Sequence, residues 1–560
     1  QTTNMTVGAT NQYVGGAFVI NRTTSTANVT SITITEQGTV NAQTNLDNIK
    51  LYYDLDSSAP YNCASEDYAG GATQYGSTDT DGFSATNGSS TFTGSVAVTP
   101  TSVMCVYTVL DVGSGATGAE TIEIQITTPS TDIVVSAGSI RNGFARVISG
   151  TTTIQNAITI SGTCDAYDLT TDCTDDGSNS IKVAVNGTLQ GQTDSVVDGA
   201  WSIGSISQPV AGDVITVFID GGATDSEEAV AITKYDGSGD IDLVRLYKEH
   251  VTIGTDTGSA NSGQSLTSTN LEQYDNEASA DEDVFYESDT VAFTCDGVAS
   301  STGFCLDKNA QTSTGRLTIL SGNTFAPASN INVHDIAIIG TFTGNGNTYT
   351  VSGSWNDTGT FTEGTSTVTF TSTSTGETIT TTGSTFSTLT FNGVAGVWTL
   401  QDSATVSGVL TITNGEFNAG SGTLTFSGTG TPLVVSGTFT ASTGTVQYTA
   451  ATATVTVTTF NNLILGGTGT YTLPASTWNI NGDLTITTGA TITKGAGTIT
   501  FNGSANTKTI TGNATNSDLG TISIGNGSLA KIINLGSSIK LTAVTITAGA
   551  TFDISSDTLT

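Results

Sequence analysis

A repeat of short apolar strands in the C-terminal part of the chain is the feature that most constrains its fold. The motif GVLTITNG (408–415) recurs as GDLTITTG (482–489), and GSGTLTF (420–426) recurs as GAGTITF (495–501). The two motifs follow one another in the same order in both places. Each unit is a short strand followed by a Gly or Asn turn, and no single unit can bury its apolar side alone. We therefore predict a parallel β-helix, in which stacked coils of roughly 20–25 residues bury these side chains in continuous columns.

The composition supports an all-β fold. Charged residues make up 11% of the 560 residues, against ~25% in ordinary globular chains. Threonine, valine and isoleucine, which favour strands, are abundant, and 66 residues are glycine. A string of small sandwiches is the alternative to the β-helix. The β-helix is favoured because the repeat is finer than a domain.

The chain divides into three predicted regions. Residues 1–148 contain alternating runs such as VTSITITE and VMCVYTVLDV, which predict an N-terminal immunoglobulin-like β-sandwich. Residues 149–235 predict a smaller sandwich with Trp201 in its core; the pattern KVAVNG, DGAWSI, AGDVITVFIDG resembles prealbumin-like sandwiches. Residues 236–560 predict the repetitive parallel β-helix, or β-solenoid.

The six cysteines fall into three separated groups of two. The simplest interpretation is three local disulfides, formed in an oxidising compartment. The predicted pairs are Cys63–Cys105, Cys164–Cys173 and Cys295–Cys305. The alternative is six reduced core cysteines. The first residue, Gln1, is typical of a secreted chain after removal of a signal peptide, so we expect an extracellular or cell-surface location.

The charge balance limits the possible partners. With 49 acidic and 14 basic residues, the formal net charge is −35. Nucleic acid needs a basic surface and anionic lipid needs basic clusters, so neither is an expected partner. The sequence has no run of apolar residues long enough to cross a bilayer, so we expect no membrane insertion.

Acidic turns are the best candidates for a binding site. Asp236, Asp240 and Asp242 lie in the sequence DGSGDID, and closely spaced carboxylates with glycines between them can surround Ca²⁺. These three residues are the predicted metal ligands, and structural calcium is the predicted cofactor. Similar acidic turns occur around Asp79 and in residues 165–176 and 275–283. The alternative for each turn is a solvated acidic loop, since none has the spacing of an EF-hand.

Catalytic signatures are absent from the sequence. The only histidines are His250 and His334, and no G-x-S-x-G motif accompanies them. The tryptophans of the repeat region could be sugar platforms, but buried stacking is the favoured interpretation; they are Trp355, Trp398 and Trp478. We therefore expect no enzymatic activity. A polysaccharide-active β-helix enzyme is the alternative.

Several segments resemble large secreted surface proteins of uncultured, candidate-phylum bacteria. The resemblance is carried by NLDNIKLYYDLD and TSVMCVYTVLDVGSG in the first region, VAVNG and AGDVITVFIDG in the second, and INVHDIAIIGTFT and WTLQDSATVSGVLTI in the third. These motifs are structural, and the resemblance implies an extracellular surface or fibre role. It implies no catalytic residues.

We expect a structural subunit of a surface filament, sheath or surface layer that binds copies of itself. The coil at residues 541–560 would expose an unfinished sheet edge, and residues 1–20 of the next subunit are the predicted partner strand. The competing explanation for that edge is further coils beyond Thr560. The alternative function is an adhesin, with the β-helix as a stalk and a surface glycan as its ligand.

Overall fold

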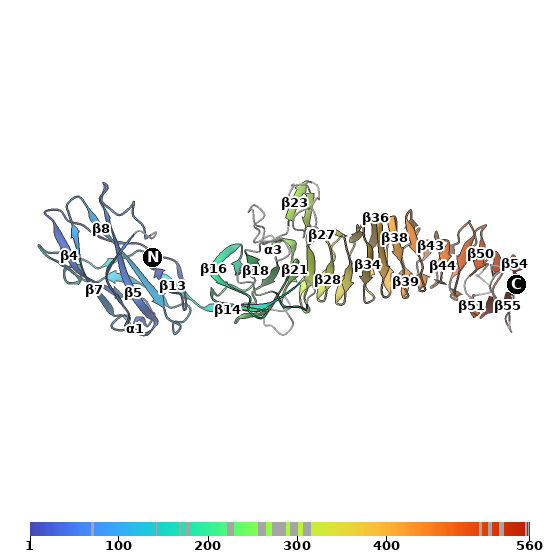
Figure 1. The fold of residues 1–560 in the computed structure, drawn as a ribbon, viewed down its shortest axis with the longest axis horizontal. Coiled ribbons are helices and arrows are strands. Elements are labelled where there is room, and N and C mark those ends of the chain that lie inside the picture. The colour runs from blue at the N-terminus through green and yellow to red at the C-terminus, as the bar shows by residue number, and fades with distance from the viewer. Residues whose placement is uncertain are drawn as a thin grey trace. The chain divides into compact units, whose positions relative to one another are not determined.

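The fold is seen in a computed structural model, which describes most of the chain. The described residues are 1–560 without 69–71, 142, 167–169, 174–179, 221–228, 256–264, 272–286, 292–300, 306–314, 503–506, 513–517, 526–530, 555–556, 558 and 560. The chain forms two compact units (Figure 1). The first contains residues 1–160 and 202–209, and the second contains residues 161–201 and 210–560.

The first unit is an antiparallel β-sandwich, as predicted. One sheet contains β4 (Ala27–Glu36), β7 (Ser89–Val98), β10 (Ile124–Ile126), β11 (Ile133–Val135) and β12 (Arg146–Val147). The other contains β2 (Gln12–Tyr13), β3 (Phe18–Ile20), β5 (Leu46–Asp56), β6 (Thr73–Asp79) and β8 (Val103–Val112). Two short helices, α1 (Ala42–Asn45) and α2 (Pro129–Asp132), lie in the connections.

A third, small sheet belongs to the same unit. It contains β1 (Asn4–Thr6), β13 (Thr152–Gln155) and β9 (Thr121–Ile122), in the order β1–β13–β9. The predicted boundary at residue 148 places β13 in the second region, but β13 pairs with β1 and β9 of the first.

Strand β8 is buried on both faces. Its inner residues, such as Val106 and Leu110, pack in the sandwich core with Ile32 and Ile34 of β4. Its outer residues form a second cluster, which we call the tyrosine cluster. This cluster contains Val103, Cys105 and Tyr107, packed with Tyr13, Ala17, Tyr52, Tyr61, Cys63, Tyr68 and Ala72. A strand that is buried on both faces has a nearly continuous apolar sequence, which explains the sequence VMCVYTVLDV.

Residues after the sandwich form two further groups of strands. One group is the three-stranded sheet of β17 (Ala200–Ser207), β14 (Ala157–Asp165) and β20 (Ile241–Tyr247). The other is an antiparallel set of β15 (Ser180–Val185), β16 (Thr188–Asp194), β18 (Val214–Asp220) and β19 (Val230–Lys234). Trp201 is buried, as predicted.

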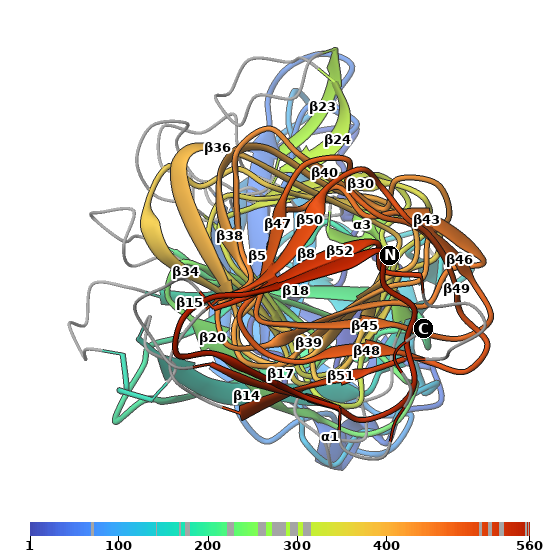
Figure 2. The same ribbon diagram turned by 90° about the vertical axis from the view of Figure 1, so that its right-hand side faces the viewer.

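Strand β19 joins this antiparallel set to a parallel β-solenoid. It pairs antiparallel with β18 on one side and parallel with β21 on the other. The solenoid runs from residue 230 to residue 553 in about 12 turns, which confirms the predicted architecture. Figure 2 looks along the stacked coils, with β39, β45 and β48 on one side and β38, β47 and β50 on another.

The solenoid strands stack in parallel columns. The first column contains β21 (His250–Ile253), β25 (Arg316–Ile319), β28 (Ile336–Ile338), β31 (Trp355–Asp357), β34 (Thr375–Thr380), β36 (Thr388–Leu400), β38 (Leu410–Asn418) and β41 (Thr438–Thr440). The second contains β24 (Ser301–Cys305), β27 (Asn330–Val333), β30 (Thr348–Val351), β33 (Thr367–Phe370), the first parts of β36 and β38, and β40 (Leu433–Val435). Strand β23 (Glu287–Val291) forms a hairpin with β24.

The third side of the solenoid is made of two sheets. The first contains β22 (Ser265–Leu266), β26 (Thr324–Phe325), β29 (Thr341–Thr343) and β32 (Thr360–Thr362), and α3 (Ser268–Leu271) follows β22. The next contains β35 (Thr385–Phe386), β37 (Ala404–Val406), β39 (Thr423–Phe426), β42 (Thr445–Tyr448), β45 (Asn462–Leu465), β48 (Leu484–Ile486), β51 (Thr507–Thr511), β53 (Ile532–Leu535) and β55 (Thr551–Asp553).

The last coils complete two further columns. One contains β43 (Thr452–Thr454), β46 (Thr470–Thr472) and β49 (Thr491–Thr493). The other contains β44 (Thr459–Phe460), β47 (Trp478–Ile480), β50 (Thr498–Phe501), β52 (Thr521–Ile524) and β54 (Ala543–Ile546). The coils differ in length: a short one leads from Phe325 to its partner Phe342, and a longer one leads from Leu484 to its partner Ile510.

The repeated motif in the sequence does not mark equivalent positions in the coil. Leu410 stacks between Leu389 and Leu433 in one column. Leu484, which occupies the same place in the motif, lies in another column, the one that contains Leu424. The motif therefore recurs on a different side of the solenoid, and the repeating unit is a strand plus its turn.

Alternation of apolar and threonine side chains builds the solenoid core. In the strand Thr423–Phe426, Leu424 and Phe426 are fully buried and the two threonines are half-buried. Aromatic rings stack along the core, with ring centroids 5.2 Å apart for Phe370 and Phe391 and 4.5 Å apart for Phe391 and Phe417. Threonine thus supplies strand propensity and a polar outer surface without charge.

Candidate functional site

Of the predicted calcium ligands, Asp236 and Asp240 lie in the turn between β19 and β20, and Asp242 lies in β20. The carboxylate Oδ1 of Asp236 accepts hydrogen bonds from the backbone N–H and the hydroxyl of Ser238, at 2.9 and 3.3 Å. Asp240 and Asp242 are exposed. Among the described residues, no three Asp, Glu, His or Cys side chains are placed to hold a metal ion. Calcium at Asp236, Asp240 and Asp242 stays a prediction from their spacing.

Two of the three predicted disulfides are present. Cys63 pairs with Cys105, and Cys164 pairs with Cys173. The predicted partner Cys295 lies outside the described residues, so the third pair is untested. Disulfides are rare in the cytosol, so the two bonds indicate a non-cytoplasmic protein. Within the part of the chain that the structure describes, no helix is long and apolar enough to span a bilayer.

Both histidines lie in solenoid strands or turns rather than in a reactive group. His250 is buried, and its Nδ1 lies 3.0 Å from Oγ1 of Thr318 on the next coil. Burial lowers the pKa of His250 to about 4, so its ring is neutral at pH 7. His334 Nδ1 lies 3.1 Å from the hydroxyl of Ser352. These contacts link successive coils.

The three tryptophans of the repeat region are core residues. Trp355, Trp398 and Trp478 are each at most 1% exposed. Trp355 packs edge-on against Phe361, and Trp398 packs against Phe391. The predicted stacking role is therefore confirmed, and these rings are not accessible to a sugar.

The last rung that the structure describes has apolar side chains that are uncovered. Val544 pairs with Ile522 and Ile546 pairs with Ile524, so all four point in the same direction. Ile522 and Ile524 are fully buried, whereas Val544 and Ile546 are 37% and 47% exposed. Another exposed apolar residue, Ile554, follows this strand in the chain. We call the strand β54 with its uncovered residues Val544 and Ile546 the terminal rung.

The predicted donor strand for this rung is already paired in its own unit. Residues 4–6 pair with β13, and residues 12–13 and 18–20 pair with β8. The N-terminal segment is therefore part of the sandwich. Strand β1 is an outer strand of the β1–β13–β9 sheet, so one of its edges has no partner strand among the described residues.

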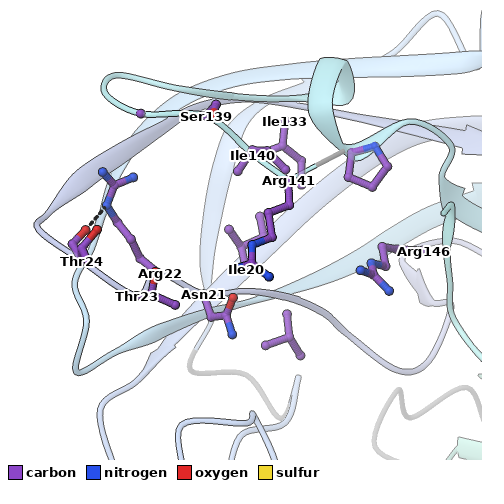
Figure 3. Close-up of a pocket in the computed structure, with 13 residues that line it drawn as sticks. Ile20, Asn21, Arg22, Thr23, Thr24, Ile133, Ser139, Ile140, Arg141 and Arg146 are labelled. Atoms are coloured by element: carbon purple, nitrogen blue, oxygen red, sulfur yellow. Dashed lines mark hydrogen bonds between the residues drawn. The ribbon is translucent and has the colours of Figure 1, made fainter. Parts of the chain in front are cut away.

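A pocket in the sandwich unit was not predicted. It lies between residues 19–24, the segment 138–141 and Arg146, and its cavity volume is about 380 Å³. Figure 3 shows the residues that line it. Arg22, Arg141 and Arg146 line it, together with the polar residues Asn21, Thr23, Thr24 and Ser139 and the apolar residues Val19, Ile20, Pro129, Ile133 and Ile140. The pair of arginines in RNGFAR was visible in the sequence, but Arg22 is far away from them in the chain.

One buried carboxylate in the same sandwich has an unusual environment. Glu36 is fully buried, and its Oε1 accepts hydrogen bonds from the backbone N–H of Gly38 at 2.6 Å and of Glu123 at 2.9 Å. Burial has the largest effect and raises the pKa of Glu36 to about 7 from an ordinary value of 4.5.

This shift predicts that the sandwich loses stability as the pH rises. In the unfolded chain Glu36 ionises near 4.5, but in the folded chain it ionises near 7. The contribution of Glu36 to the free energy of unfolding is fully present below pH 4.5 and is lost between pH 4.5 and 7. The loss amounts to about 3 kcal/mol at most. We expect Glu36→Gln to remove this part of the pH dependence and to stabilise the unit at pH 8. Hydrogen exchange of β4 peptides at pH 5 and pH 8, corrected for intrinsic exchange rates, measures the effect.

The exposed Asp81 supplies the control for this prediction. Asp81→Asn removes the same charge from the surface and should leave the pH dependence of the unit unchanged. Identical pH profiles for the unmodified chain and Glu36→Gln would contradict the prediction.

No protein-family model matches the chain, and no curated protein matches it.

Proposed function

We propose that this chain is a structural protein of the cell exterior, a subunit that assembles into a surface filament, sheath or layer. The observation that carries the proposal is the terminal rung. Val544 and Ile546 continue a column whose previous members are fully buried, but they are themselves uncovered. Another copy of this chain is the proposed cover.

The geometry of the rung suits addition of a strand. A parallel strand placed on β54 would continue the stacking that joins β50, β52 and β54. It would pair the free backbone groups of the edge and bury the apolar side chains together. The edge of β1 that does not pair with β13 is the candidate donor, which makes the contact head-to-tail. Such heterologous contacts form open filaments unless rotation closes a ring.

The proposed role is non-catalytic and extracellular. The two disulfides suit an oxidising exterior, and the low-charge, threonine-rich coils give a rod whose stability is shared between neighbours. The proposal includes no metal, nucleic acid or membrane partner.

Assembly is testable with paired variants of one strand. We expect the purified chain to form fibres or larger assemblies in negative-stain electron microscopy. The double variant Val544→Asp, Ile546→Asp should remain monomeric, because two carboxylates cannot be buried without partners in an apolar column. Sedimentation velocity gives the fraction of monomer for each protein.

Thr545 provides a matched control in the same strand. It pairs with Ser523 and faces away from the column, so Thr545→Asp adds charge without touching the apolar surface. This variant should assemble like the unmodified chain. A soluble monomer for the unmodified chain at all concentrations would refute the proposal, and so would unimpaired assembly of the double variant.

A further inference from the structure

The pocket of the sandwich unit concentrates positive charge in a strongly negative chain. Residues 1–148 contain four basic residues, and three of them line this one pocket: Arg22, Arg141 and Arg146. No acidic residue is among those that line it. The nearest carboxylate in the sequence is Asp132, which lies in α2 between the lining residues Pro129 and Ile133 but is not among the residues that line the pocket.

Arg22 is fixed in place by the backbone around it. Its Nε donates to the carbonyl oxygens of Thr24 and Ser25, at 3.0 and 2.7 Å, and its Nη1 donates to the carbonyl oxygen of Ala137 at 3.0 Å. A weaker contact of 3.4 Å joins Nη2 to the Ser25 hydroxyl. A guanidinium has five N–H donors, so two remain for a ligand. The cation is thus pre-oriented before anything binds.

Arg141 and Arg146 supply the accessible charges. Both are exposed, and neither guanidinium has a hydrogen bond or ion pair to any described residue. Figure 3 shows them reaching the pocket from the segment that follows Ile140. Phe144, which lies between them in the sequence, is 92% exposed but is not among the residues that line the pocket.

We propose that this pocket binds a carboxylate-bearing sugar unit of an acidic polysaccharide. Guanidinium groups match a carboxylate through paired hydrogen bonds. The hydroxyl and amide groups of Asn21, Thr23 and Ser139 match sugar hydroxyls, and Ile20 and Ile140 form an apolar wall. A cavity of about 380 Å³ falls within the range of small-molecule sites, ~300–1,000 Å³. This inference does not depend on self-assembly.

Binding of trigalacturonate to the full chain tests the proposal. Isothermal titration calorimetry at low salt should give saturable binding, and the fully methyl-esterified trisaccharide should bind at least about ten-fold more weakly because its carboxylates are neutral. The double variant Arg141→Gln, Arg146→Gln should lower the affinity for trigalacturonate by about ten-fold or more. Its melting temperature should be unchanged, since neither guanidinium has a hydrogen bond or ion pair to a described residue.

Two controls make the result specific. Lys248→Gln, Lys508→Gln removes the same number of charges from the second unit and should leave the affinity unchanged. Inorganic phosphate at equal ionic strength should compete poorly, because it lacks the sugar hydroxyls. Equal binding of the ester, full affinity in the arginine variant, competition by phosphate as strong as by the sugar, or absence of binding would each overturn the proposal.

Discussion

We expect Phe391→Ala to be among the most destabilising single substitutions in the solenoid. Phe391 is fully buried and contacts three other rings, those of Phe370, Phe417 and Trp398. Truncating a buried phenylalanine costs about 3–5 kcal/mol, because apolar burial is lost and a cavity remains. We expect the loss of stability to be confined to the coils that contain these rings, since each coil contacts only its neighbours.

Tryptophan fluorescence during urea unfolding measures this loss. Three of the four tryptophans, Trp355, Trp398 and Trp478, lie in the solenoid, and the fourth, Trp201, lies at the boundary between the two units, so most of the signal reports on the solenoid. Val394 is the matched control: it lies in the same strand, β36, but is 68% exposed. Val394→Ala should change the free energy of unfolding by less than about 0.5 kcal/mol. Equal effects of the two substitutions would show that the rings at Phe391 do not stabilise the column.

Removing the Cys63–Cys105 disulfide should have a comparable effect in the other unit. The two cysteines are separated by 42 residues, for which chain entropy alone gives about 4 kcal/mol. The bond also holds the loop against the tyrosine cluster on the outer face of β8. The carboxylate of Asp56 stabilises the loop, because it accepts hydrogen bonds from the backbone N–H groups of Asn62 and Cys63. We therefore expect Cys63→Ala, Cys105→Ala to unfold the sandwich at much lower urea concentration.

Hydrogen exchange of peptides from β5 and β8 measures this unit directly. The second disulfide gives a graded comparison, because Cys164 and Cys173 are separated by only 9 residues and the same relation gives about 2.6 kcal/mol. Cys164→Ala, Cys173→Ala should leave exchange in β5 and β8 unchanged. A smaller loss for the longer loop than for the shorter one would contradict the entropic account.

The solenoid was predictable from sequence because its pattern is local. A run such as Thr-Leu-Thr-Phe alternates regardless of which column it occupies, so the fold class follows from the strand-and-turn unit. The register does not follow, because Leu410 and Leu484 carry the same motif on different sides. The corners set the length of each coil, and the strand pattern carries no information about them.

The disulfide between Cys164 and Cys173 could be predicted from the sequence, whereas the arginine pocket could not. Cys164 and Cys173 are close in the chain, so their pairing followed from spacing. Arg22 and Arg141 line the same pocket because the tertiary fold brings residues 19–24 next to the segment 138–141, as the hydrogen bond from Arg22 Nη1 to the carbonyl oxygen of Ala137 shows. Spacing along the chain cannot show such a site.

Strand β19 also bears on the order in which this chain folds. A parallel coil has no hairpin to nucleate it, and its first contacts span many residues, which makes initiation slow. Here β19 is held by antiparallel pairing with β18 and presents its other edge to β21. The β18–β19 pair therefore offers a ready template for the first rung. Because synthesis proceeds from the N-terminal end, the β18–β19 pair is available before the coils that follow it, and each coil can add to the one before it.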